Sequence, residues 1–142
     1  MDQKVTYKEI IMADEAQKDV QAKPVTNVIA CLRSEFGERL SEALAVRERF
    51  GKDESFHASV PPDAVVTPHT TEEVSRIVTV CAEHRVPVIP YGTGTALEGH
   101  VAALHGGISI NLQEMNQVVE LHAEDLDVVV QPGVTRKQLN NY

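Results

Sequence analysis

The segment at residues 90–99, PYGTGTALEG, has the residue types and spacing of an anion-binding loop. Gly92 and Gly94 allow positive φ angles and remove the β-carbons that would hold a ligand away. Successive backbone amides could then converge on an anion, and Thr93 and Thr95 could add hydroxyl donors. The segment therefore predicts a site built from main-chain groups.

No cation lies close to this loop in the sequence, because neither Lys nor Arg occurs between Arg85 and Arg136. We therefore expect amides and hydroxyls alone to hold the anion, which suits a diphosphate. The spacing does not fit an ATP-type loop, which needs Lys and Ser or Thr after Gly99. It also fails the dinucleotide fingerprint, which needs glycine where Leu97 stands. On spacing alone, glycines that only turn the chain between two strands remain the alternative.

The elements around the loop predict an α/β unit. Strands are expected at residues 64–66 and 88–90, where short apolar runs are closed by prolines. Between them, Thr70 and Glu73 fit a capping box at the start of a helix. That helix is expected to bury one apolar stripe, formed by Val74, Ile77, Val78 and Cys81, and to carry His84 and Arg85 in its last turn. Strand, helix and strand in so few residues favour a parallel crossover, whose carboxyl edge is where α/β proteins bind ligands.

Further elements complete the expected organisation. Residues 1–23 are polar and predict a flexible N-terminal extension, and residues 24–142 are expected to form part of a single domain. Helices are predicted from Val25 to Phe36, from Ser41 to near Gly51, and from Val134 onward, the last with Thr135 and Gln138 as a capping box. Additional strands are predicted at residues 108–112, 118–121 and 128–130.

Composition and charge exclude several functions. The formal net charge of −8 argues against nucleic acid and anionic membrane surfaces as partners. No apolar run is long enough to span a membrane, and the N-terminus lacks a signal peptide, so we expect a cytoplasmic protein, or a mitochondrial one in a eukaryote. Cys31 and Cys81 are interpreted as thiols in a reducing compartment. The six histidines show no zinc spacing, and the acidic run Glu124, Asp125 and Asp127 is interpreted as a solvated turn.

Three segments in this order carry a family resemblance: PVIPYGTGTALEGH, GGISINLQEMNQVVEL and VVVQPGVTRKQLN. Together they resemble the first half of the FAD-binding domain of the vanillyl-alcohol oxidase superfamily, the PCMH-type domain. The nearest branch holds the FAD-linked D-lactate dehydrogenases of the cytochrome type and the flavin subunit of glycolate oxidase. The resemblance runs from about Gly51 to Tyr142. It implies an α/β (α+β) fold, incomplete, whose first subdomain has a short parallel βαβ sheet flanked by helices.

The resemblance also implies a cofactor and a site. FAD would be bound noncovalently, with its pyrophosphate and adenosine held by Tyr91, Gly92, Thr93, Gly94, Thr95, Gly99, Pro132 and Gly133. His100 is interpreted as a polar loop residue. Catalytic and metal-binding residues would lie beyond Tyr142, and the region with the substrate domain is absent from this sequence.

The function implied is oxidation of a small D-2-hydroxy acid, of the D-lactate or glycolate type, to the 2-oxo acid, with reduction of the flavin and transfer of electrons to an acceptor. Two alternatives stay open. The chain could belong to another flavoenzyme of the same superfamily, such as a synthase or a reductase that uses a nicotinamide donor. It could also be a noncatalytic truncated fragment, and we expect these 142 residues alone to be inactive.

Overall fold

The computed structural model describes residues 24–142, and the predicted extension at residues 1–23 lies outside the described residues. Residues 24–36 are helical, as the spacing of apolar residues predicted. The elements that follow are η1 (Gly37–Arg39), β1 (Leu40–Ser41), α2 (Leu44–Phe50), β2 (Ala64–Val66), α3 (Thr71–Glu83), β3 (Val88–Tyr91), β4 (Ile108–Asn111), β5 (Val118–His122), β6 (Asp127–Val130) and α4 (Arg136–Asn140).

The main sheet has four strands in the order β1-β2-β4-β3. Both β2 and β3 run parallel to β4, which confirms the parallel arrangement expected around α3. The third predicted strand thus lies between the first two. Strand β1 was not predicted, because it is two residues long and gains its order from antiparallel pairing with β2.

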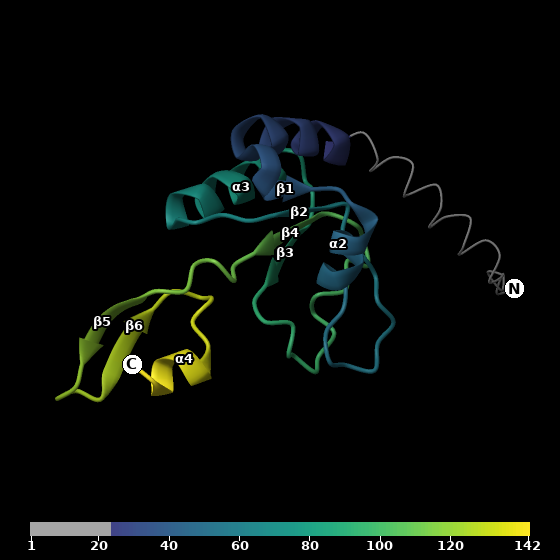
Figure 1. Ribbon diagram of the computed structural model, residues 1–142. Helices are drawn as coiled ribbons and strands as arrows, with labels where there is room; N and C mark the ends of the chain where they lie inside the picture. The colour runs from purple at the N-terminus through teal and green to yellow at the C-terminus, as the bar shows by residue number, and fades with distance from the viewer. Residues whose placement is uncertain (1–23) are drawn as a thin grey trace, which may run out of the picture.

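The apolar strands of the sheet are buried on both faces, as expected for parallel strands. Val66 and Ile110 face the larger core, which lies beneath the helix at residues 24–36 and α3. Val65 faces a second core together with Phe50 of α2 and Tyr91. Figure 1 shows the helix at residues 24–36 and α3 on one side of the sheet and α2 on the other. Successive side chains along each strand therefore point to opposite faces of the sheet, so each face packs against the helices on its own side.

Helix α3 begins and packs slightly differently from the prediction. Thr70 caps it by accepting a hydrogen bond from the amide of Glu73, as expected. The carboxylate of Glu73, however, accepts from the amide of His69 and not from Thr70. Val78 is 44% exposed, whereas Val80 is buried, so the predicted stripe is wrong at one position. Residue 80 turns inward because it lies three residues after Ile77, on the same face. His84 and Arg85 follow the helix end and are not in its last turn.

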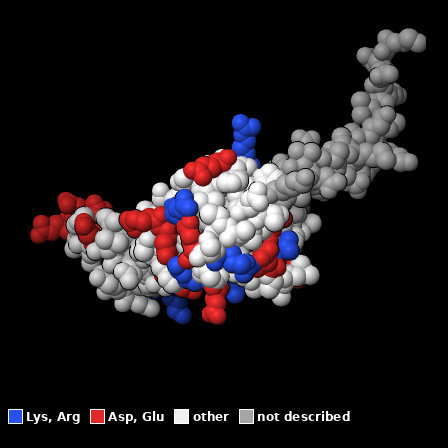
Figure 2. All heavy atoms as spheres, turned by 90° about the horizontal axis from the view of Figure 1, so that it is seen from above, with Lys and Arg blue, Asp and Glu red and all other residues white. Residues whose placement is uncertain are grey.

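Strands β5 and β6 form a separate antiparallel hairpin. Figure 1 shows this hairpin beside α4, to one side of the main sheet. The predicted acidic turn is confirmed for Glu124 and Asp125, which are exposed in the turn that joins the two strands. It is wrong for Asp127, which begins β6 and has its Oδ1 2.5 Å from Nδ1 of His122. Acidic side chains gather at this end of the molecule, while Lys and Arg elsewhere are interspersed with acids (Figure 2). None of the helices within residues 24–142 combines the length and the apolar character needed to cross a bilayer.

Candidate functional site

The glycine-rich loop lies at the carboxyl edge of the main sheet. Strand β3 ends at Tyr91, whose carbonyl accepts a hydrogen bond of 2.9 Å from the amide of Leu112. At the same edge, Asn111, the last residue of β4, donates from its side chain to the hydroxyl of Thr67 after β2, at 3.1 Å. The loop at residues 92–100 therefore leaves the sheet where the parallel strands present their carboxyl ends, as predicted.

The amides of residues 92–95 are available to a ligand. Within the described part of the chain, none of them donates a hydrogen bond to a protein acceptor. These residues are exposed or half-buried and are not packed inside the protein. The hydroxyl oxygens of Thr93 and Thr95 lie 3.0 Å apart on the same stretch. Backbone groups without internal partners at an exposed turn are the donors that the sequence predicted for an anion.

Two hollows flank the loop and share Thr93 and Gly94. The first, which we call the loop hollow, has a volume of about 270 Å³ and is lined by Gly92, Thr93, Gly94, Thr95, Ala96, His100 and Val101. The second, the α2 hollow, has a volume of about 350 Å³ and is lined by Arg49, Lys52, Asp53, Glu54, Tyr91, Thr93 and Gly94. His100, interpreted above as a polar loop residue, thus forms part of the wall beside the free amides.

The glycines of the loop have different geometric roles. Gly94 has a φ of +73°, and a β-carbon there would lie 2.1 Å from the hydroxyl oxygen of Tyr91. Gly99 has a φ of +71°, and its β-carbon would lie 2.4 Å from Cδ2 of His57. Gly92 does not have a positive φ, so that part of the prediction is wrong. No protein atom lies within 4 Å of a β-carbon built on Gly92, which leaves the space beside it open.

Tyr91 is buried at the start of the loop and packs against α2. Its side chain is 5% exposed, and its ring lies 4.5 Å from that of Phe50, centroid to centroid. Its hydroxyl is directed toward the carbonyls of Arg49 and Lys52, each 3.5 Å away. The amino acid at position 91 therefore links the loop to the end of α2.

Pro132 and Gly133 lie outside the lining of both hollows. The amide of Gly133 donates to the carbonyl of Met115 at 2.7 Å. A β-carbon at Gly133 would lie 2.5 Å from the carbonyl oxygen of Leu112. A close approach of two backbone segments therefore explains the glycine at this position without a ligand.

The structure corrects the expectation that no cation is close to the loop. Arg49 lies in the last turn of α2, and Lys52 follows two residues beyond Phe50, the last residue of the helix. Both line the α2 hollow together with Thr93 and Gly94. The sequence did not reveal this because some forty residues separate these cations from the loop. Figure 1 shows the segment after α2 and the loop after β3 on the same side of the sheet.

Asp53 is a further site residue that the sequence reading missed. It is 8% exposed, its Oδ1 accepts from the amide of Ser55 at 3.0 Å, and its Oδ2 has no hydrogen-bond partner in residues 24–142. Hydrogen bonds from Ser55 lower the pKa of Asp53 below its ordinary value, and the backbone of Gly99 lowers this pKa further. Burial acts in the opposite direction and raises it. The residue is therefore an ionised carboxylate against the second half of the loop. The Asp-x-Ser pattern, typical of a side-chain-capped turn, was its only local signal.

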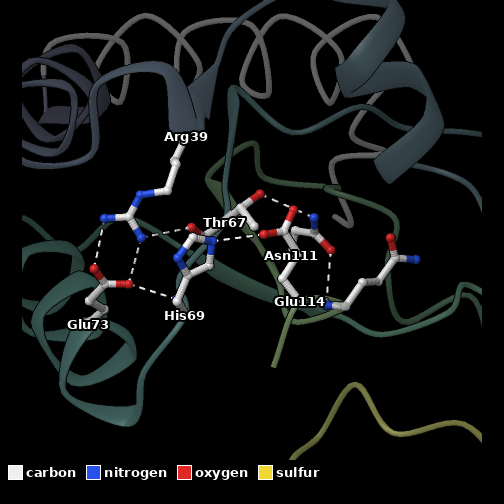
Figure 3. Close-up of polar contacts among 7 residues, drawn as sticks. Arg39, Thr67, His69, Glu73, Asn111 and Glu114 are labelled. Atoms are coloured by element: carbon white, nitrogen blue, oxygen red, sulfur yellow. Dashed lines mark hydrogen bonds and ion pairs between the residues drawn. The ribbon is translucent and has the colours of Figure 1, made fainter. Parts of the chain in front are cut away.

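A polar network connects η1, the start of α3 and the residues that follow β2 and β4 (Figure 3). Arg39 donates to both carboxylate oxygens of Glu73 at 2.7 Å, and His69 approaches Glu114 at 2.8 Å. The Arg39 guanidinium and the amide of His69 lower the pKa of Glu73 to about 2. These contacts connect the segment before β1, the start of α3 and the turn after β4. No group of three His, Cys, Asp or Glu side chains in the described chain is arranged to hold a metal ion.

Comparison with known proteins shows which class of domain this fold and loop belong to. Residues 62–142 match the family described as FAD binding domain, so the chain belongs to this family. The predicted family, the fold class and FAD as the cofactor are thereby confirmed. The open space at Gly92 and the unpartnered amides of residues 92–95 fit a group that needs close backbone approach.

Individual relatives make the comparison more specific. The chain is 54% identical to "Probable D-lactate dehydrogenase, mitochondrial" of Danio rerio over 119 residues, which are 83% of this chain and 24% of that protein. It is 41% identical to "Glycolate oxidase subunit GlcD" of Bacillus subtilis (strain 168) over 97 residues, 68% of this chain and 21% of the relative. A solved structure of 4-ethylphenol oxidase from Gulosibacter chungangensis has a TM-score of 0.74 at 25% identity, covering 84% of this chain and 24% of that one. The chain therefore spans about a quarter of the length of the proteins it matches.

Proposed function

We propose that this chain forms the diphosphate-binding part of an FAD-dependent dehydrogenase that oxidises a small D-2-hydroxy acid to the 2-oxo acid. The observation that carries the proposal is the set of free amides at residues 92–95, exposed at the carboxyl edge of the sheet. The names of the D-lactate dehydrogenase and glycolate oxidase relatives support the substrate class. This comparison and the redox chemistry that FAD supplies are the support for the activity proposed for the whole protein.

Each loop residue has a proposed role. The amides of Gly92, Thr93, Gly94 and Thr95 would hold the diphosphate, with the two threonine hydroxyls as additional donors. Gly99 would keep the second half of the loop close to the segment after α2. Pro132 and Gly133 would contact the adenosine end. Tyr91 would act mainly as a support, because its ring and hydroxyl are engaged below the loop.

We propose that binding is noncovalent, because Thr95 and Ala96 follow the second glycine of the loop. Bound FAD supplies the redox chemistry, while the protein supplies orientation and electrostatics. One relative is named as a mitochondrial protein and another is bacterial, so a mitochondrial or a bacterial setting is compatible with the proposal.

Flavin binding and turnover test the proposal separately. The full-length protein should be yellow, hold FAD in about a one-to-one ratio, and bleach anaerobically with D-lactate or glycolate. Absence of flavin after reconstitution with FAD would contradict the cofactor site. Bleaching only by an unrelated substrate or by a nicotinamide donor would favour another flavoenzyme activity. The 142-residue chain, assayed alongside, tests the fragment alternative, in which FAD binding is weak and turnover absent.

A further inference from the structure

We propose that Arg49 and Lys52 supply the positive charge that the cofactor diphosphate needs and that the glycine loop itself lacks. The inference rests on the proposed FAD site and extends it to a segment of the chain far from the loop in sequence. Any ligand with adjacent phosphates would be bound in this way: backbone amides donate to the phosphate oxygens, and neighbouring cations balance the negative charge.

Tyr91 fixes the backbone that carries both cations. Its hydroxyl is directed toward the carbonyls of Arg49 and Lys52, and its ring packs against Phe50 between them. Because Tyr91 is also the last residue of β3, these contacts connect the end of α2 to the start of the loop. The side chains of Arg49 and Lys52 then line the α2 hollow beside Thr93 and Gly94.

Both cations are available. Arg49 and Lys52 are exposed, and neither forms an ion pair with any residue in the described chain. The guanidinium of Arg49 lies over the ring of Phe50, with its Cζ 5.6 Å from the ring centroid. Three other arginines of the domain do form ion pairs: Arg33 with Glu42, Arg39 with Glu73, and Arg76 with Glu35. The two unpaired cations therefore lie beside the unpartnered amides.

The two carboxylates of the α2 hollow act differently from each other. Asp53 is buried, and its Oδ1 accepts from the amide of Ser55, which closes a turn within the segment. Glu54 is exposed, and its amide donates to the carbonyl of Ala96 at 3.2 Å, which holds the segment against the loop. Because the Glu54 carboxylate would repel a diphosphate, its neutralisation should strengthen binding, whereas loss of either cation should weaken it.

Titration of the full-length apoprotein with FAD tests this assignment. Arg49→Gln and Lys52→Gln should each weaken FAD binding about five-fold at low salt, and Glu54→Gln should strengthen it about two-fold. Both cation variants should also reduce the salt dependence of the FAD dissociation constant. Affinity for riboflavin, which has no phosphate, should stay at the parental value. Arg49→Lys and Lys52→Arg keep the charge and should retain parental affinity for FAD.

A matched control removes the same charge elsewhere. Arg85 precedes β3, at the opposite edge of the sheet from the loop, and has a φ of +55° that asparagine tolerates. Arg85→Asn should leave FAD affinity unchanged. Parental FAD affinity and salt dependence in both Gln variants would overturn the inference, as would an equal loss of riboflavin binding. Failure of the parent protein to bind FAD would instead overturn the proposed function together with it.

Discussion

A β-carbon placed on Gly94 would lie 2.1 Å from the hydroxyl oxygen of Tyr91, far inside van der Waals contact. The same construction at Gly92 meets no protein atom within 4 Å. The two glycines of the GTG sequence therefore satisfy different requirements. Gly94 is needed for internal packing and for its positive φ, whereas Gly92 leaves space open at the surface of the site.

This difference predicts separable effects of substitution. Gly94→Val should lower the melting temperature and abolish FAD retention, because a β-branched residue resists a positive φ and collides with Tyr91. Gly92→Ala should change the apoprotein's stability by less than about 0.5 kcal/mol and weaken FAD binding by about ten-fold. Calorimetry and FAD titration measure the two effects. Unchanged FAD affinity in Gly92→Ala would contradict the role given to the loop.

The Arg39–Glu73 pair predicts a loss of stability in acid. The folded-state pKa of Glu73 is about 2, below its ordinary value of 4.5. The contribution of its ionised form is therefore complete above about pH 5 and is lost as the pH falls toward 2. With allowance for solvent screening, Glu73→Gln should cost about 1–2 kcal/mol at pH 7 and flatten the fall in stability between pH 5 and 2.

Denaturant unfolding at several pH values measures this effect. Glu35→Gln is a matched control, because Glu35 is paired with Arg76 at a more exposed site on the same layer of helices. Its cost should be about 0.5 kcal/mol or less. Equal losses in the two variants would show that the position of Glu73 confers no special stability.

The buried hydroxyl of Ser109 is a position at which we expect a substitution to increase stability. It is fully buried in β4, and its hydroxyl has no hydrogen-bond partner in the described structure. Its neighbours across the sheet, Val65 and Ile89, are apolar members of the second core. Ser109→Ala should therefore raise the free energy of unfolding by about 1 kcal/mol, because it removes an unsatisfied polar group. A loss of similar size in chemical denaturation would show that the hydroxyl has a partner.

The two cysteines should differ in reactivity. Burial raises the pKa of the Cys81 thiol to about 11, so very little thiolate is present at pH 8. Cys31 is half-buried. Iodoacetamide applied to the native protein should label Cys31 first, and peptide mass spectrometry should find Cys81 labelled only after denaturation. Equal labelling rates in the native state would contradict the buried position of Cys81.

The sequence by itself determined the local elements and the chemistry of the loop. The run at residues 64–66 is apolar throughout, and the run at residues 108–110 is apolar except for Ser109, so both patterns predict strands. Thr70 caps α3 as predicted, because capping depends on residues within one turn. The glycines and threonines of residues 92–95 predicted free donors at an exposed turn, since no helix or strand follows to use them.

Tertiary structure decided the relationships between segments that are far apart in sequence. Strand β4 lies between β2 and β3, and Arg49 and Lys52 lie beside Thr93, because packing of Phe50 against Tyr91 brings the end of α2 beneath the loop. A local sequence pattern cannot predict such a contact, because it depends on how the side chains of α2 pack against those of the sheet. Sequence therefore specified which groups could bind a diphosphate, and the fold determined which charges surround them.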